Sequence, residues 1–376
     1  MPNVPTTINV MIKKTTLILV TPRLYQIVLF LCYNLVTMWR KNIAIDLGTA
    51  NSQVWASGQG VVFSEPSVVA VDGLNGKVIA VGTQAYEMLG KTGAGANLTA
   101  QKPLRDGVVA DYLVCEAMLK YFLDKVLGKP WTSRLMRPEV MVCIPSGITQ
   151  VERRAVLEAT LAAGAKTAYL IEHTLAAAIG AKLPIDAAVG SMIVDIGAGQ
   201  TSAAVVSLGS IVVSATSKVG GAKLDEAIAT YIRRNHNLII GERTSEEIKI
   251  KIGSAVLGGI KRVIEVKGRD AILGMPRTIN IEAGEVSEAM SPALSAIIAC
   301  IKSVLEQVPP ELASDIIDRG IVLSGGTSQL RSIDRLISAQ TGVSAYVVED
   351  PIRCVVYGTG VALENIDKWK RVIQQR

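Results

Sequence analysis

Two short segments of this sequence combine an aspartate with a glycine-rich turn between hydrophobic stretches. The first is residues 45–52 (IDLGTANS), and the second, in the later half of the chain, is residues 194–201 (VDIGAGQT). Glycine lets the backbone turn tightly, so that successive N–H groups can point at one anion, as they do in many phosphate sites. The repeated pattern therefore predicts two phosphate-binding turns.

The aspartates of these turns, Asp46 and Asp195, each end a hydrophobic run. Mg²⁺ prefers oxygen ligands and keeps several waters, so both carboxylates could hold a hydrated Mg²⁺ against phosphate oxygens. Either turn alone is typical of an ordinary hairpin. The prediction of a phosphate and Mg²⁺ site therefore depends on two copies of the turn opposed across a cleft. A third glycine turn, residues 323–327 (LSGGT), opens a helical pattern and could lie flat against a nucleoside.

The segments around these turns alternate strand and helix patterns from Asn42 onward, which predicts an α/β chain with mixed sheets. Hydrophobic residues make up 49% of the chain, enough for a sizeable core, and this fraction excludes general disorder. Strands are expected at 42–47, 53–57, 67–71, 78–81, 140–144, 168–171, 191–196, 202–208, 211–217, 263–266, 278–281 and 320–323. Helices are expected at 112–127, 151–163, 174–181, 224–234, 245–255, 285–307, 310–318 and 330–340, with a closing helix after 351.

The formal charge of +6 is unevenly distributed along the chain. Residues 1–41 contain five basic residues and no acid, and the remainder is nearly neutral. Binding to nucleic acid requires a clustered cationic face, so no nucleic-acid partner is expected. The five cysteines are scattered without C-x-x-C spacing and only two histidines accompany them, a pattern that suits reduced thiols in a cytosol better than a zinc site.

Two segments could meet a membrane. The apolar run 24–39 within the N-terminal extension has 16 residues, fewer than the roughly 20 that span a bilayer. Three interpretations stay open for residues 1–37: a dispensable or unexpressed extension with Met38 as the start, an anchor on the membrane surface, or a spanning anchor.

The second segment, residues 128–137, places an apolar trio among three basic residues, which suits an acidic headgroup interface. The trio is Trp131, Leu135 and Met136. The alternative is a loop that folds its apolar groups back onto the body.

Taken together, the three glycine turns resemble the two phosphate motifs and the adenosine motif of the actin, Hsp70 and hexokinase superfamily. Three strings narrow the resemblance to the MreB family of bacterial actins, which are rod-shape-determining proteins. They are residues 43–51 (IAIDLGTAN), 144–154 (IPSGITQVERR) and 309–316 (PPELASDI). The resemblance runs from about Met38 to the C-terminus.

The resemblance implies an α/β, two-lobed actin-like fold of duplicated ribonuclease-H-like domains, with ATP and Mg²⁺ in a nucleotide cleft between the lobes. Residues 38–185 would form the first lobe, with a small subdomain near 72–106. Residues 186–350 would form the second, with a small subdomain near 222–285, and 351–376 would return to the first lobe.

The resemblance also implies the nucleotide-contacting residues. Phosphates would meet Gly48, Thr49, Ala50 and Asn51 from the first lobe and Gly197, Ala198, Gly199, Gln200 and Thr201 from the second, with Asp46 and Asp195 at the metal. The nucleoside would lie near Gly220, Gly221, Glu246, Lys249, Gly325, Gly326 and Thr327. Without the resemblance, a solvated helix face is the favoured interpretation of Glu246 and Lys249.

The chain departs from the family where water is positioned for attack. The family has Glu-Glu-Pro at the start of one helix, and its second glutamate orients the water; here the segment is Glu172-His173-Thr174. In the second phosphate motif, Ala198 replaces a glycine and Gln200 replaces a threonine. The catalytic candidates are therefore His173, Gln200 and Glu172.

Three interpretations of these departures remain open. A neutral histidine can act as a base, so slow turnover could survive. Phosphoryl transfer depends mostly on positioning, so ATP could instead be bound and barely hydrolysed. His173 could also be a helix-start residue with no catalytic role.

The function implied is an ATP-binding cytoskeletal protein that polymerises into filaments and organises cell-wall synthesis to set rod shape. Its partners would be copies of itself, the inner membrane surface and cell-wall elongation proteins, at the cytoplasmic face of the membrane. The alternative is an Hsp70-like or sugar-kinase-like soluble ATPase domain, although no catalytic aspartate motif for a sugar hydroxyl stands out.

Overall fold

The computed structural model describes residues 42–369 and 373–375, except 75, 89–97, 103, 106–107, 110, 129–136 and 259–261. The N-terminal extension 1–37 lies outside the described residues. So do Trp131, Leu135 and Met136 of the loop expected at a membrane. Both membrane predictions therefore remain predictions.

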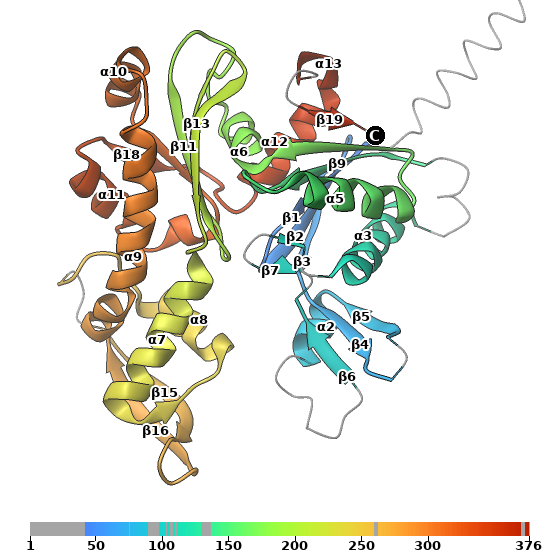
Figure 1. Ribbon diagram of the computed structural model, residues 1–376. Helices are drawn as coiled ribbons and strands as arrows, with labels where there is room; N and C mark the ends of the chain where they lie inside the picture. The colour runs from blue at the N-terminus through green and yellow to red at the C-terminus, as the bar shows by residue number, and fades with distance from the viewer. Residues whose placement is uncertain are drawn as a thin grey trace, which may run out of the picture.

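A six-stranded mixed sheet carries the first glycine turn (Figure 1). Its order is β19-β10-β9-β1-β2-β3, with β1 antiparallel to β2 and parallel to β9. Alternate side chains of β1 enter different cores, Ile43 and Ile45 on one face and Ala44 on the other, as the pleat requires. The strands are β1 (Asn42–Leu47), β2 (Asn51–Ala56), β3 (Gly60–Pro66), β9 (Glu139–Ile144), β10 (Thr167–Glu172) and β19 (Gln374–Gln375).

A five-stranded sheet carries the second glycine turn and repeats the same local design. Its order is β13-β12-β11-β17-β18, with β11 antiparallel to β12 and parallel to β17. Asp195 pairs with Ser202 across the hairpin as Asp46 pairs with Gln53. The strands are β11 (Ser191–Ile196), β12 (Thr201–Ser207), β13 (Ser210–Ser217), β17 (Ile321–Ser324) and β18 (Ala345–Val347).

Smaller sheets accompany both large sheets, and the two three-stranded ones extend toward the same end of the molecule (Figure 1). On the first side they are β4 (Val69–Asp72), β5 (Val78–Val81) and β6 (Leu98–Gln101) with α2 (Thr83–Met88), and the pair β7 (Leu104–Arg105) and β8 (Val108–Val109). On the second side they are β14 (Leu238–Ile239), β15 (Val263–Asp270) and β16 (Pro276–Glu282).

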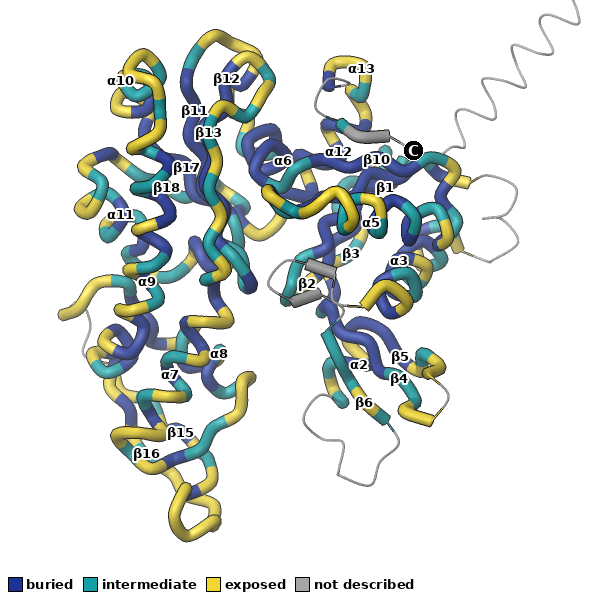
Figure 2. Tube along the Cα trace, in the orientation of Figure 1, coloured by how far each residue is buried: buried dark blue, intermediate teal, exposed yellow. Residues whose placement is uncertain are grey.

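Helices cover the sheets and bury their apolar faces (Figure 2). On the first side they are α3 (Tyr112–Leu127) and α5 (Gln150–Ala162). On the second they are α7 (Gly221–His236), α8 (Glu242–Ile252), α9 (Ala283–Leu305), α10 (Pro310–Arg319), the short 3₁₀ helix η1 (Gly326–Gln329) and α11 (Ile333–Thr341). Helix α9 is long and apolar enough to cross a bilayer, but Met290, Ile297 and Ile301 pack in the core beside β12 and β13.

Two crossing helices join the large sheets. They are α6 (His173–Gly180) and α12 (Cys354–Glu364), and α13 (Ile366–Trp369) follows them. One hydrophobic cluster contains Ile171 of β10, Leu175 of α6 and Ile193 of β11, so the two halves share a core at this crossing. A helix that begins at the end of β10 is thereby held against both sheets.

The predicted α/β character with mixed sheets is confirmed, although some element bounds differ. The strand β3, the helix α2 and the strands β6 to β8, β14, β18 and β19 were not expected from the sequence. The third glycine turn opens the single 3₁₀ turn η1, and the helix predicted at 330–340 begins only at Ile333. Short edge strands carry little periodicity of their own, which is why the sequence did not indicate them. The lobe boundaries at 38–185, 186–350 and 351–376 stay a prediction.

Candidate functional site

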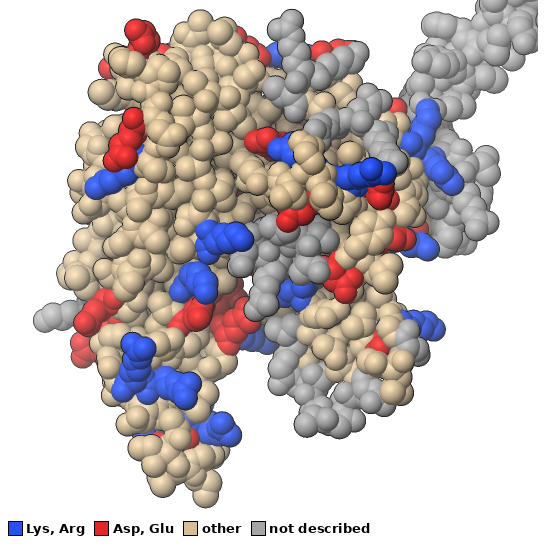
Figure 3. Space-filling view, viewed as in Figure 1, with Lys and Arg blue, Asp and Glu red and all other residues tan. Residues whose placement is uncertain are grey.

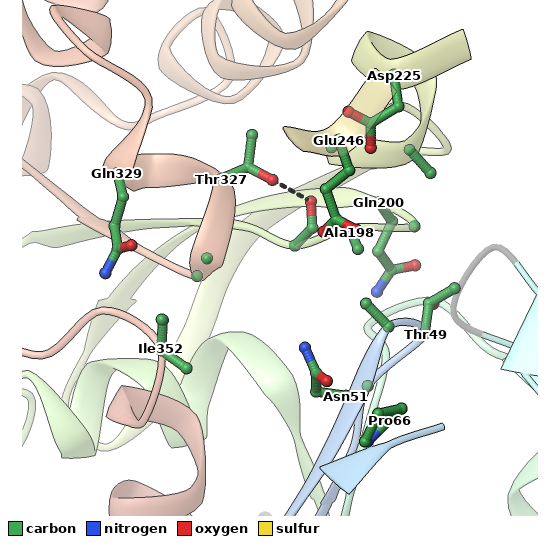
Figure 4. Close-up of a pocket in the computed structure, with 18 of the residues that line it drawn as sticks. Thr49, Asn51, Pro66, Ala198, Gln200, Asp225, Glu246, Thr327, Gln329 and Ile352 are labelled. Carbon is green, nitrogen blue, oxygen red and sulfur yellow. Dashed lines mark hydrogen bonds between the residues drawn. The ribbon is translucent and has the colours of Figure 1, made fainter. Parts of the chain in front are cut away.

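The glycine turns of the two sheets face each other across a cavity of about 710 Å³ (Figure 4). Most of the predicted nucleotide-contacting residues line it, and the third glycine turn closes one side. The predicted residues in the lining are Asp46, Gly48, Thr49, Ala50, Asn51, His173, Asp195, Gly197, Ala198, Gly199, Gln200, Gly221, Glu246, Lys249, Gly325, Gly326 and Thr327.

The first turn is tight and is held from behind. A Cβ atom on Gly48 would lie 2.3 Å from the carbonyl oxygen of Asn51, so this close approach requires glycine. The Ser67 hydroxyl donates to the carbonyl oxygen of Gly48 at 2.5 Å. The turn is therefore fixed by its own sequence and by the segment that follows β3.

The second turn is bonded to its neighbours in the same half of the molecule. The carbonyl oxygens of Gly197 and Ala198 accept hydrogen bonds from the first amides of α7 at 3.0 and 2.8 Å. The Thr327 hydroxyl also donates to Gly197 O, at 2.9 Å (Figure 4). The second turn, α7 and η1 are thus one hydrogen-bonded unit.

The two turns come into contact across the cavity. A Cβ atom on Gly199 would lie 2.4 Å from the Thr49 hydroxyl oxygen. Figure 4 shows Gln200 extending from the second turn toward Thr49 and Asn51 of the first. An anion between the turns would meet groups from both halves at once.

His173 lies between the aspartates of the two turns. Its Nε2 is 3.2 Å from Asp46 Oδ1, and its Nδ1 is 3.0 Å from Asp195 Oδ2. Asp195 also accepts a hydrogen bond from the Ser324 hydroxyl at 2.7 Å. All three charged groups are largely buried, with side-chain exposures of 16%, 9% and 4% for His173, Asp46 and Asp195.

The electrostatics of this cluster favour the charged forms of His173 and Asp195. Burial acts to lower the pKa of His173, but the carboxylates of Asp195 and Asp46 beside it hold that pKa well above its usual range. Burial likewise acts to raise the pKa of Asp195, but His173 and the Ser324 hydroxyl hold it below its usual value. The cluster is best described as a cation between two carboxylates.

Three predicted residues do not line the cavity. Glu172 forms an ion pair with Arg153 at 2.9 Å. The Thr201 hydroxyl donates to the carbonyl oxygen of Val219 at 2.7 Å. Gly220 packs against the second turn, since a Cβ there would lie 2.5 Å from Gly197 O. These residues support the site from outside, and a direct catalytic role for Glu172 has no geometric support.

The far end of the cavity holds a buried ion pair, of which the sequence predicted only one member, Lys249. Lys249 Nζ lies 2.9 Å from Asp225 Oδ2 and donates to the carbonyl oxygen of Gly221 at 3.1 Å. Asp225 was not predicted, although it follows Gly221 by one helical turn of α7 and so faces the same side. Other lining residues without a sequence signal are Gln53, Lys102, Glu242, Arg243, Gln329, Arg331 and Ile352.

Asp225 should make the stability of the fold depend on pH. Burial raises its pKa to about 6 from 3.8, although Lys249 opposes the shift. Between these values the unfolded chain has lost the proton that the folded chain keeps, so this group lowers the free energy of unfolding as pH rises, by up to about 3 kcal/mol. In urea titrations, we expect the unfolding free energy of Asp225→Asn to rise relative to that of the wild type by up to about 3 kcal/mol between pH 4 and pH 7. An equal pH slope in both proteins would contradict this assignment.

Comparisons with known proteins agree with this geometry. A family model described as MreB/Mbl protein matches residues 40–371. The cell shape-determining protein Mbl of Bacillus cereus is 46% identical over 331 residues, which are 88% of this chain and 98% of that protein. The cell shape-determining protein MreB of Escherichia coli is 48% identical over 336 residues, 88% of this chain and 95% of that protein.

Solved structures show the same architecture. MreB5 of Spiroplasma citri bound to ADP has a TM-score of 0.82 and 35% identity, and the match covers 89% of this chain and 99% of that one. The same protein bound to AMPPNP also has a TM-score of 0.82. A chain of the MamK double helical filament has a TM-score of 0.69 at 22% identity, over 87% of this chain and 99% of that one. The predicted two-lobed actin-like fold is confirmed by these likenesses.

Proposed function

The chain belongs to the MreB/Mbl family of cell shape-determining, actin-like cytoskeletal proteins, and on that premise we propose that it binds ATP and assembles into filaments. The observation that carries the proposal is the pair of glycine turns, one from each large sheet, opposed across a cavity of about 710 Å³. Solved MreB5 is bound to ADP in one structure and to AMPPNP in another. Nucleotide would bind this chain in the same cavity.

The lining suggests how ATP would lie. Phosphates would meet the backbone amides of the two turns, since such turns form anion-binding concavities. The nucleoside would lie at the far end, between Glu246 and Lys249 of α8 and the third turn at Gly325. On the face shown in Figure 3, acidic and basic side chains of the described residues are interspersed.

Hydrolysis is proposed to be slow. Both ring nitrogens of His173 lie within 3.2 Å of carboxylate oxygens, which would compete with an attacking water for the imidazole. Gln200, which extends into the gap between the turns, is the remaining group that could orient a water. A single neutral amide would position the attacking water weakly, so we expect slow hydrolysis and not a complete loss of hydrolysis.

Mg²⁺ enters the proposal with a restriction. Asp46 and Asp195 supply the hard oxygen donors that Mg²⁺ prefers. One oxygen of each carboxylate contacts His173, so a hydrated Mg²⁺ would be held by the other carboxylate oxygens. The mechanism above uses no metal.

The wider cellular role follows the family resemblance. We propose that filaments form at the cytoplasmic face of the inner membrane and organise cell-wall synthesis together with elongation proteins. The apolar and basic composition of residues 128–137 supports membrane contact, as does the basic N-terminal extension if it is present.

Sedimentation with lipid vesicles tests the proposal. With ATP, the full chain is expected to pellet as filaments and to carry anionic vesicles with it, because nucleotide bound between the lobes favours the assembling form. Without nucleotide it should stay in the supernatant. Transfer of phosphate to a sugar without any filament would instead support the sugar-kinase alternative. Binding of ATP with neither outcome would favour an isolated ATPase domain.

A further inference from the structure

The hairpin of β15 and β16 carries large apolar side chains into solvent. The two strands pair antiparallel, and the turn between them projects at the lower end of the second half of the molecule (Figures 1 and 2). Ile272, Leu273 and Met275 of this turn have exposed fractions of 77%, 77% and 67%. Single exposed apolar residues are normal on a protein surface, whereas three on one projecting turn mark an interaction surface. We call residues 271–276 the hairpin tip.

Asp270 holds the hairpin tip in one shape. Its Oδ1 accepts hydrogen bonds from the backbone N–H groups of Ile272 and Leu273, both at 2.9 Å. Its Oδ2 pairs with Arg277 Nη1 at 2.5 Å, and Asp270 itself is buried. Gly274 completes the turn at a φ of +72°. The apolar side chains are therefore presented by a preorganised turn, which reduces the conformational entropy lost on binding.

Basic side chains surround the hairpin tip. Those of the hairpin and of the adjoining last turn of α7, here called the basic collar, are Lys267, Arg269, Arg277, Arg233 and Arg234. Arg277 joins the two elements, because it donates to the carbonyl oxygen of His236 at 2.7 Å. Within residues 266–278 the only acid is Asp270, which is already paired, and Glu265 lies 3.5 Å from Lys267 and offsets one charge. In Figure 3, basic side chains lie above the largely uncharged lower end of this half.

An apolar point inside a basic collar suits an anionic lipid surface. Apolar side chains at a membrane interface leave water at the boundary of headgroups and acyl chains. Lysine and arginine near an anionic leaflet add a favourable electrostatic contribution. A protein partner would need an acidic pocket shaped to this convex turn, whereas a bilayer deforms around it. The shape and the charge therefore favour lipid as the occupant.

We propose that the hairpin tip inserts Ile272, Leu273 and Met275 into an anionic lipid surface while the basic collar contacts its headgroups. The inference rests on the proposed filaments and deepens that function, since it assigns a membrane contact separate from residues 128–137. One tip offers only three apolar side chains and binds weakly. A filament presents a tip on every subunit, and linked contacts bind far more tightly than single ones. Filaments, and not single chains, are therefore expected to hold the lipid.

Flotation of filaments with vesicles tests the inference. The full chain is assembled with ATP and mixed with vesicles of equal parts phosphatidylglycerol and phosphatidylcholine, and assembly is measured separately by pelleting without lipid. Ile272→Ser combined with Leu273→Ser should assemble as wild type does but need at least about tenfold more lipid for half-maximal flotation, because burying either side chain fully contributes about tenfold or more. Both side chains are exposed, so their loss leaves the fold intact.

A matched control and a charge variant sharpen this test. Ile317 of α10 is also exposed, at 66%, but the acidic Asp318 follows it, so Ile317→Ser should float as wild type does. Lys267→Gln combined with Arg269→Gln should raise the lipid requirement by about fivefold or more. Wild-type filaments should not float with phosphatidylcholine alone, and high salt should weaken their flotation with the anionic vesicles.

The outcomes separate this inference from the proposed function. If wild type forms no filaments with ATP, the proposed function fails. If filaments form and the Ile272→Ser, Leu273→Ser protein floats like wild type, the hairpin tip is not the lipid contact and the proposed filaments stand. Flotation lost only on replacing Trp131 and Leu135 with serine would assign the contact to residues 128–137 instead. A tip variant that no longer assembles would show that the tip contacts a second copy of the chain, which would also overturn the lipid assignment.

Discussion

Replacing Gly325 with valine is expected to abolish measurable ATP binding and to lower the free energy of unfolding by about 3 to 5 kcal/mol. Gly325 joins β17 to η1 at a φ of +85°, in the left-handed region. A Cβ atom there would lie 2.4 to 2.9 Å from the backbone oxygen, carbon and nitrogen of Ile196. A backbone neighbour cannot rotate away as a side chain can, so the third turn must move off the second.

The neighbouring glycine supplies a matched control. A Cβ atom on Gly326 would meet nothing within 4 Å, and Gly326 has no positive φ. The unfolding free energy of Gly326→Ala should therefore stay within about 0.5 kcal/mol of the wild-type value. Urea unfolding of both variants measures the contrast. Equal behaviour of Gly325→Val and Gly326→Ala would show that the turn tolerates displacement and would contradict the prediction.

Replacing Gly358 with valine is expected to cost at least about 3 kcal/mol of unfolding free energy, or to prevent accumulation of folded protein. A Cβ atom on Gly358 of α12 would lie 1.8 Å from the carbonyl oxygen of Ala176 in α6. In the converse contact, a Cβ atom on Gly180 of α6 would lie 1.9 Å from the carbonyl oxygen of Cys354 in α12. The two helix backbones touch, and no rotamer of valine can relieve the collision.

The same substitution should disturb the site, because α6 begins at His173. Any variant that still folds is expected to bind nucleotide more weakly than wild type as α6 shifts. Gly284 in α9 is the control: it too is helical, but a Cβ there meets nothing within 4 Å. Gly284→Ala should be neutral or stabilise by up to about 1 kcal/mol. Thermal melting compares the two, and a Gly358→Val protein as stable as wild type would refute the close helix crossing.

Local sequence was sufficient for the elements that carry their own periodicity. The predicted bounds of β1, β5, β11 and α3 coincide with the observed ones, because alternation or helical spacing of apolar residues is visible within each segment. The same holds for most of the cavity lining, since a glycine turn after an aspartate is a local signal. Elements such as β3 and β14 were missed because their stability comes from the strands beside them, β2 and β15.

By itself, then, the sequence determined the two glycine turns, the α/β pattern and the replacement of an expected glutamate by His173. Tertiary structure alone decided what those residues do to one another. It turned Glu172 away toward Arg153, brought Asp225 to Lys249, and set the His173 ring between carboxylates from opposite sheets. The physical reason is that charges separated by 19 to 127 residues along the chain interact only when folding brings them together, and the strength of that interaction depends on burial that no local pattern records.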